Sequence, residues 1–375
     1  YWTLTSLDIL GAEIAENTQV RTISTLSAWQ RPDGGYGGPD QLAHLAATYA
    51  AVLALTVIGT PEAYDSINRA QLYKFLMRMK QPNGSFTAHE GGEIDVRGSY
   101  CVMVAAALTN LLTEELCENV AEYIVSCQTY EGGIASHPGV EAHGGYTYCG
   151  LAALEIIGKS DQLDIPSLLS WAVSRQMAFE GGFQGRTNKL VDGCYTFWLG
   201  AIFPMLEAVL RRQYATEHLQ GTSDSDDQET AYINDQMEYL YDRERLQQYV
   251  LACCQGPKGG LRDKPERHPD PYHTLYVLTG LSLSQNHVID DSLLMTMADH
   301  VDSSESEATA ETSRLLPCTF HALKTLKWTV DIVDQCVVGK VENLLKATHP
   351  IYNVPLNKVV QVFKYFYGDK VKPFL

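Results

Sequence analysis

Two kinds of apolar pattern alternate along the chain. The first is amphipathic, as in EELCENVAEYIVSCQ at residues 114–128, where Leu116, Val120 and Ile124 recur at helical spacing. The second is apolar almost all round and occupies residues 44–59, 96–112, 143–158, 194–210 and 272–283. A helix without a polar face must be buried on all sides, so the alternation predicts two helical layers with the apolar set inside. No alternation typical of strands competes with this pattern.

A short glycine motif separates the two kinds of helix. It reads PDGGYGG, PNGSF, YEGGI, FEGGF and PKGGL, with first glycines at Gly34, Gly84, Gly132, Gly181 and Gly259. The successive intervals are 50, 48, 49 and 78 residues. Glycine permits the positive φ that a tight exit from a helix requires. The sequence therefore predicts a repeated unit of amphipathic helix, glycine turn and apolar helix.

The repeat predicts an all-α fold in which about six helix pairs form a single domain over residues 1–375. Such pairs form an open solenoid or close into an α/α toroid. The wholly apolar inner layer favours the closed toroid, because an open solenoid leaves a more polar concave face. The last interval is too long, and we interpret a polar, acidic stretch at about residues 213–240 as an insertion. DSSESEATAETSR at about residues 302–314 predicts a flexible loop.

The charge and the cysteine content narrow the possible environments. The chain has 28 basic and 45 acidic residues, a net charge of −17, which argues against nucleic acid or an anionic membrane as the main partner. Its nine scattered cysteines are an odd number and indicate free thiols in a reducing compartment, so a cytoplasmic location is expected. No apolar run reaches the about 18 residues of a membrane-spanning helix, so no membrane insertion is expected.

Titratable residues recur at one phase of the repeat. Asp192 and Cys194 follow Gly181 by 11 and 13 residues, and His273 follows Gly259 by 14. These positions are the N-terminal ends of successive inner helices, which gather around one mouth of a toroid. Asp, Cys and His would supply three protein ligands and leave a fourth position open, as at catalytic zinc sites. Taken alone, a buried cysteine is more often a core residue, and a histidine at a helix start is more often a cap. The shared phase favours the metal site.

A cationic cluster and an aromatic wall are predicted beside this site. Arg186 and Lys189 precede the metal pair, and His143, Tyr195 and Arg97 share its phase near helix N-termini, which attract anions. This arrangement would suit a diphosphate, although any one base could be an ordinary surface residue. The inner wall would carry Tyr100, Tyr146, Cys149, Trp198 and Tyr276, which suit a long hydrocarbon but are also common in cores.

Three long motifs carry a family resemblance. VEAHGGYTYCG at residues 140–150, EGGFQGRTNKLVDGCYTFW at 180–198 and YHTLYVLTGLS at 272–282 resemble the β subunits of protein prenyltransferases, and those of the farnesyltransferase branch most closely. The likeness covers nearly the whole chain except the insertion and the stretch from about 290 to 345. That family is an α/α toroid that works as a heterodimer with a helical-repeat α subunit.

The resemblance implies a role for each matching residue. Asp192, Cys194 and His273 would hold Zn²⁺, and Asp263 would match an aspartate associated with Mg²⁺. His143, Arg186, Lys189 and Tyr195 would bind the diphosphate of farnesyl diphosphate. The isoprenoid site would be formed by Arg97, Tyr100, Gly145, Tyr146, Cys149, Trp198 and Tyr276. Trp2 and Tyr272 would shape the groove for a protein ending in C-a-a-X, whose cysteine thiol would become a thioether.

Several alternatives stay open at the level of sequence. The β subunit of geranylgeranyltransferase type I shares the toroid and the zinc trio; Asp263 and the bulky Tyr276 favour the shorter farnesyl donor by resemblance. The β subunit of the Rab-modifying enzyme matches the zinc loops less well. From a different class, a toroidal binding module without catalysis would lack stoichiometric zinc. A protonating terpene cyclase would need an acid in repeat phase, whereas the DSDD motif at residues 224–227 lies in the polar insertion.

Overall fold

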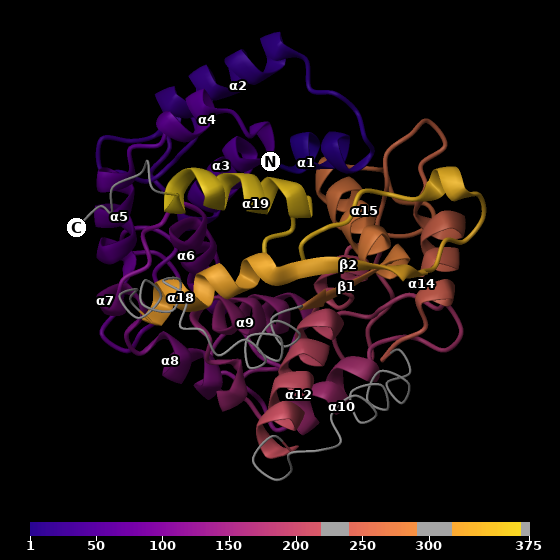
Figure 1. Cartoon of the computed structure of the whole chain (residues 1–375). Helices are drawn as coiled ribbons and strands as arrows, with labels where there is room; N and C mark the ends of the chain where they lie inside the picture. The colour runs from indigo at the N-terminus through magenta and orange to yellow at the C-terminus, as the bar shows by residue number, and fades with distance from the viewer. Residues whose placement is uncertain (219–239, 291–316, 369–375) are drawn as a thin grey trace, which may run out of the picture.

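The computed structural model describes residues 1–218, 240–290 and 317–368. Within these ranges the chain forms a ring of helices in two layers (Figure 1). The inner layer consists of α1 (Trp2–Ile9), α3 (Leu45–Ile58), α6 (Val96–Leu108), α9 (Gly144–Ile157), α11 (Tyr195–Trp198) and α15 (Pro271–Gln285). Each of these helices packs against the next, and α15 packs against α1, so the ring is closed. The closed α/α toroid predicted from the apolar pattern is confirmed.

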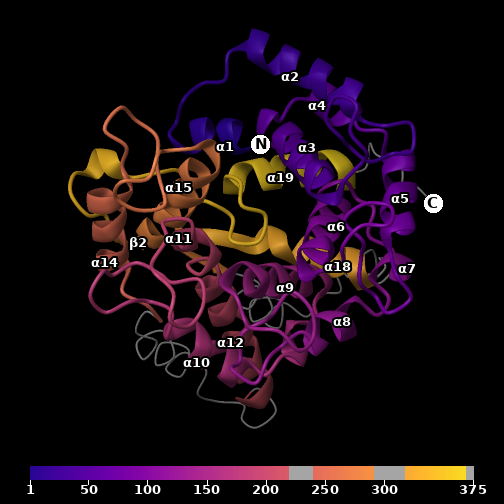
Figure 2. The ribbon, with the colours of Figure 1, turned by 180° about the vertical axis from the view of Figure 1, so that it is seen from behind.

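The outer layer is formed by the amphipathic segments. It contains α2 (Glu16–Trp29), α5 (Arg69–Met79), α7 (Glu114–Cys117), α8 (Val120–Ser126), α10 (Ile165–Val173) and α14 (Arg243–Tyr249), the last followed by a π-helical turn at Val250–Cys254. Outer helices lie on the periphery and inner helices around the centre in both views (Figures 1 and 2). In α3, α6 and α9 nearly every side chain is buried, which is why these segments have no polar face.

The turn glycines hold neighbouring repeats together. Gly132 has a φ of 103°, and a Cβ placed there would lie 2.0 Å from the carbonyl oxygen of Ser167 in the next outer helix. Gly84 has the same relationship with Asn119, also at 2.0 Å. A side chain is therefore excluded both by backbone conformation and by space. At Gly259 a Cβ would meet no described atom within 4 Å, so the positive φ of 95° is the requirement there.

Two predicted helices are interrupted. The apolar run at 194–210 divides into α11 and α12 (Ile202–His218), with a turn at residues 199–201. Pro204 has no N–H to donate and is tolerated only in a first helical turn, so it marks a new helix rather than a continuation. The amphipathic run at 114–128 divides between α7 and α8 at Asn119, whose φ is 60°.

A two-stranded β-sheet was not predicted and departs from the purely helical expectation. β1 (Asn286–Asp290) directly follows α15 and pairs antiparallel with β2 (Trp328–Gln335). The chain then crosses the centre of the ring before α19 (Leu356–Tyr367) (Figure 1). The remaining elements are α4 (Pro61–Asp65), α18 (Pro317–Lys324) and 3₁₀ turns at Ser160–Gln162, Thr325–Lys327 and Val341–Asn343.

The two expected loops lie almost wholly outside the described residues. α12 runs to His218, so the first residues of the expected insertion at 213–240 are helical, and the DSDD motif is not described. The loop expected at 302–314 also falls outside the described ranges. In the described part of the chain, every helix is too short or too polar to span a bilayer.

Candidate metal centre and adjoining cavity

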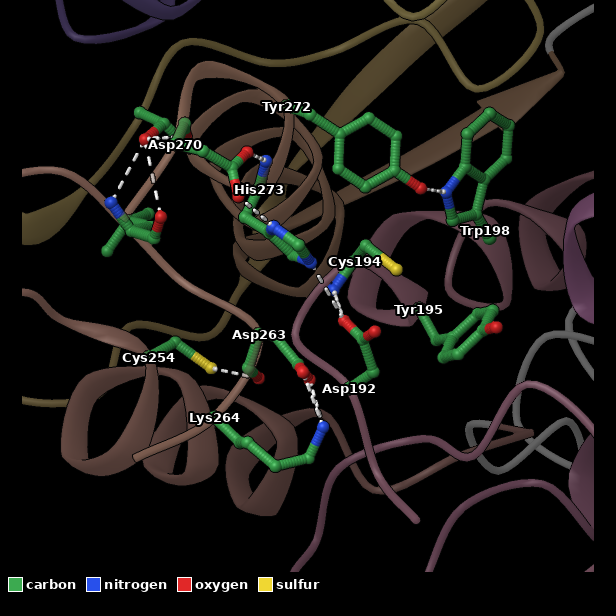
Figure 3. Close-up of polar contacts among 12 residues, drawn as sticks. Asp192, Cys194, Tyr195, Trp198, Cys254, Asp263, Lys264, Asp270, Tyr272 and His273 are labelled. Atoms are coloured by element: carbon green, nitrogen blue, oxygen red, sulfur yellow. Dashed lines mark hydrogen bonds and ion pairs between the residues drawn. The ribbon is translucent and has the colours of Figure 1, made fainter. Parts of the chain in front are cut away.

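The three predicted metal ligands meet at one point of the ring. One ligand atom from each of Asp192, Cys194 and His273 lies within 4.8 Å of the other two. Asp192 and Cys194 stand just before α11, and His273 lies in the first turn of α15, the neighbouring inner helix (Figure 3). Nε2 of His273 is 3.4 Å from Oδ1 of Asp192. The donor set and its partial burial fit a zinc ion with one open position.

Asp270 orients the metal-facing histidine. Its Oδ2 lies 2.5 Å from Nδ1 of His273, while its Oδ1 accepts the backbone N–H of His273 at 2.8 Å as the N-cap of α15. Nδ1–H therefore donates to Asp270, and Nε2 is directed toward Asp192 (Figure 3). Carboxylates in this second position fix the ring and raise its basicity at zinc sites. The sequence analysis missed Asp270, although a D-x-x-H sequence at a helix start was visible.

The electrostatics of the trio change with its protonation. Burial alone would lower the pKa of His273, but its hydrogen bonds to Asp192 and Asp270 overcome this and raise it to about 9. Burial, and next the Asp192 carboxylate, raise the pKa of the Cys194 thiol well above its usual value. Both shifts favour the protonated forms of His273 and Cys194 at neutral pH. A bound dication would displace both protons, since metals take thiolate and neutral imidazole.

Asp263 is tied by its backbone to the metal loop. The N–H of Gly193, between the two ligands of that loop, donates to the carbonyl oxygen of Asp263 at 2.7 Å. The Tyr249 hydroxyl donates to the same oxygen at 3.2 Å. The Asp263 carboxylate itself contacts the Lys264 ammonium (Figure 3). Its predicted link to Mg²⁺ stays a prediction.

A cavity of about 940 Å³ opens beside the trio. Tyr195 and Tyr272, which adjoin Cys194 and His273 in sequence, lie on its wall. Of the substrate-site residues expected from the sequence, the wall contains Trp2, Arg97, Tyr100, His143, Gly145, Tyr146, Cys149, Arg186, Tyr195, Trp198, Tyr272 and Tyr276. Lys189 is exposed on the preceding loop and is not part of the wall.

Polar groups at the cavity are held in defined orientations. Nδ1 of His143 accepts the N–H of Gly145 at 3.0 Å, so Nε2 carries the proton and donates to the Tyr195 hydroxyl at 2.9 Å. The Tyr195 proton is then free to point into the cavity. Burial, and next Arg186, lower the pKa of His143, which keeps it neutral.

The two arginines of the cavity are each paired with a carboxylate. Arg186 contacts Glu141 at 2.8 Å, and Arg97 contacts Asp95 at 2.6 Å. All four groups lie near the surface or the cavity, so these pairs are exchangeable contacts of low net stability. Both arginines of the predicted cationic cluster are therefore paired with acidic neighbours, and the role of the cluster in binding a diphosphate stays a prediction.

Aromatic rings form a further part of the cavity wall. The Trp198 and Tyr276 rings stack at 4.3 Å, and Trp198 Nε1 donates to the Tyr272 hydroxyl at 2.9 Å. Trp2 from α1 meets the Tyr272 ring edge-on at 5.5 Å. Residues far apart in sequence therefore form one apolar face beside the trio.

Sequence reasoning missed further residues of the wall. They are Tyr1, His44, Tyr49, Glu93 and Asp95, among others. His44 caps α3 through Nδ1 as His143 caps α9, and both follow Ala at equivalent points of their repeats. That repetition was a usable signal.

The chain is similar in sequence to known proteins and in fold to a solved structure. Residues 1–354 match the family described as the prenyltransferase alpha-alpha toroid domain. The chain is 41% identical to the protein farnesyltransferase subunit beta of Pisum sativum, over 98% of this chain and 88% of that protein. It is 44% identical to the Arabidopsis thaliana subunit, over 78% and 68%. The solved protein geranylgeranyltransferase-I of Candida albicans, complexed with GGPP, superposes with a TM-score of 0.64 at 17% identity over 98% of this chain and 90% of that one, which supports the fold.

The closed toroid and its Asp-Cys-His centre define a prenyltransferase of the α/α-toroid class. Within that class, the chain belongs to the family of protein farnesyltransferase β subunits. The resemblance stated from its sequence motifs is confirmed.

Proposed function

We propose that this chain, paired with an α subunit, binds zinc and transfers farnesyl from farnesyl diphosphate to the cysteine of C-a-a-X proteins in the cytoplasm. The observation that carries the proposal is the direct adjoining of the Asp192–Cys194–His273 trio to an aromatic cavity with hydrogen-bond donors on one side. Eight free thiols in the described ranges agree with a reducing compartment.

The metal would activate the nucleophile, which is the cysteine thiol of the protein substrate. Zinc held by the trio would lower the pKa of an incoming substrate thiol so that it reacts as thiolate at neutral pH. Asp270 holds His273 in the orientation that this coordination requires. With a metal bound, the Asp192 carboxylate and the Cys194 thiolate would both be anionic. They would partly neutralise the charge of the ion, and the bound substrate thiolate would stay nucleophilic.

The cavity would bind the prenyl donor, farnesyl diphosphate. Tyr195, with its proton free, and the arginines Arg186 and Arg97 would stabilise the negative charge that develops on the departing diphosphate. Release of Glu141 and Asp95 from these arginines would accompany anion binding. Mg²⁺ near Asp263 would add to the same stabilisation. Trp198 and Tyr276 would hold the hydrocarbon and exclude water from its reacting carbon.

The test is a competition assay. The chain is co-expressed with an α subunit and given a C-a-a-X peptide with equal farnesyl and geranylgeranyl diphosphate, with and without a zinc chelator. The proposal expects mostly farnesylated peptide and loss of transfer on chelation. Mostly geranylgeranylated peptide would keep the zinc chemistry and replace the donor; no transfer by a zinc-loaded heterodimer would support a binding module instead.

A variant separates the metal from the diphosphate site. His273→Ala is expected to abolish stoichiometric zinc and turnover while largely sparing the affinity for farnesyl diphosphate, because His273 does not lie on the cavity wall. Intact zinc stoichiometry in this variant would refute the ligand assignment.

A further inference from the structure

A buried tyrosine behind the cavity connects the wall to the C-terminal part of the chain. Tyr148 of α9 is fully buried and lies behind the wall rather than on it. Its ring packs edge-on against Tyr100 at 5.2 Å and Trp198 at 5.3 Å, both of which do line the cavity. Its hydroxyl reaches the loop between β2 and α19, the segment that crosses the ring centre (Figures 1 and 2).

The distances in this region determine which hydroxyl donates to which carbonyl oxygen. The Tyr148 hydroxyl lies 3.0 Å from the Pro350 carbonyl oxygen and 2.8 Å from that of Ile351. The Tyr100 hydroxyl lies 2.9 Å from the Ile351 oxygen and 3.0 Å from the Tyr148 hydroxyl. Each hydroxyl has one proton to donate. Both carbonyls are satisfied only when Tyr148 donates to Pro350 and Tyr100 donates to Ile351.

The hydrogen bond to Pro350, which pins this loop to α9, therefore depends on the Tyr148 hydroxyl. Within the described part of the chain, Tyr148 supplies the hydrogen bond that the Pro350 oxygen receives. Residues 348–355 are buried, so this oxygen has no access to bulk water once the Tyr148 hydroxyl is removed. The loop would then lose its anchor at Pro350 on α9, while Ser282 of α15 still holds it at Lys346 and Thr348.

The position of Tyr100 connects this hydrogen bond to the length of the isoprenoid donor. Tyr100 lies one helical turn beyond Arg97 on α6, so it stands deeper in the ring than the cation that faces the diphosphate end. A donor whose diphosphate is held at Arg97 would extend its hydrocarbon toward Tyr100. We infer that Tyr148 is a positioning residue for donor length: it fixes Tyr100, Trp198 and the C-terminal loop, and so sets how long an isoprenoid the cavity accepts. This inference rests on the proposed function.

The variant that tests it is Tyr148→Phe, which keeps the ring contacts and removes only the hydroxyl. The affinities for farnesyl and geranylgeranyl diphosphate are measured by direct binding on the purified α–β complex, and kcat and KM for each donor are measured with one C-a-a-X peptide. We expect the preference for farnesyl over geranylgeranyl diphosphate to fall by about three- to tenfold, the change that corresponds to one hydrogen bond. The fall should appear in donor affinity and KM, with kcat for farnesyl transfer nearly unchanged.

Tyr352→Phe is the matched control. Tyr352 lies in the same loop and is fully buried, but its hydroxyl contacts Thr325 at 2.9 Å, away from the cavity. A merely structural role for the loop would move the donor preference in both variants. Tyr148→Leu, which also removes the ring, should shift the preference at least as far as Tyr148→Phe.

Two outcomes would overturn the inference. One is an unchanged donor preference in Tyr148→Phe with an intact melting transition; the other is an equal change in Tyr352→Phe. Wild-type chain that binds neither diphosphate would instead refute the proposed function, and with it the premise of the inference. Because binding is measured apart from transfer, the two failures are distinguishable.

Discussion

The side chain of Asp270 contacts both the backbone N–H and the imidazole ring of His273. Its Oδ1 accepts the backbone N–H of His273 at 2.8 Å, and its Oδ2 lies 2.5 Å from Nδ1 of the imidazole. One carboxylate therefore begins helix α15 and aims the metal-facing nitrogen of its first turn. The start of the helix and the geometry of the site are the same feature of the chain.

Asp270→Asn separates these two tasks. Asparagine caps helices about as well as aspartate, so α15 should keep its start. The charge that raises the basicity of His273 is lost, and we expect zinc affinity to fall about 10- to 100-fold. Chelator competition on the purified complex measures this fall. Asp164→Asn, at the exposed N-cap of α10, is the control and should leave zinc affinity unchanged. Equal affinity in wild type and Asp270→Asn would show that Asp270 only caps the helix.

Tyr195→Phe tests the donor assigned to the departing diphosphate. His143 donates to the Tyr195 oxygen, so the tyrosine proton remains available to an anion in the cavity. Because that proton stabilises charge that grows during bond cleavage, its loss should lower the single-turnover rate about 100- to 1,000-fold. Affinity for farnesyl diphosphate should change less. A weakened affinity with an unchanged rate would place the hydroxyl in ground-state binding instead.

Much of the ring could be predicted, because its inner helices are apolar all round and its turns require glycine. The pairing of Asp192 and Cys194 with His273 followed from a shared repeat phase, which translates directly into position on a toroid. The break between α11 and α12 was missed although Gly200 and Pro204 stand in that run. The two-stranded sheet was missed because its stability depends on pairing between strands distant in sequence, even though β2 reads WTVDIVDQ. Asp270 and Tyr148 were missed because what they do depends on which groups the tertiary fold places beside them.

Gly132→Ala tests why the turn glycine recurs. The added methyl would lie 2.0 Å from the Ser167 carbonyl oxygen, at a backbone φ of 103° that side chains rarely adopt. We expect a loss of at least about 2 kcal/mol in the free energy of unfolding, since strain and a steric clash add. Gly139→Ala is the matched control: its φ is 86°, but a methyl there meets no atom within 4 Å among the described residues. It should cost only about 1 kcal/mol, from backbone strain alone. Similar losses in urea unfolding would show that packing against the next repeat contributes little.

His349 should make the stability of the fold sensitive to acid. Burial lowers its pKa from 6.5 to about 3, although its hydrogen bond to the Thr325 carbonyl at 2.8 Å opposes this shift. Above pH 6.5 the side chain is neutral in both the folded and the unfolded chain and adds no pH dependence. Below pH 6.5 the unfolded chain takes up a proton that the folded chain excludes, so the free energy of unfolding falls as pH falls toward 3. The slope from this one group approaches about 1.4 kcal/mol per pH unit. His349→Gln cannot titrate, and it should therefore be less stable than wild type at pH 7 but lose less stability between pH 6.5 and 4.5. Parallel curves of melting temperature against pH for the two proteins would exclude His349 as the source of the acid sensitivity.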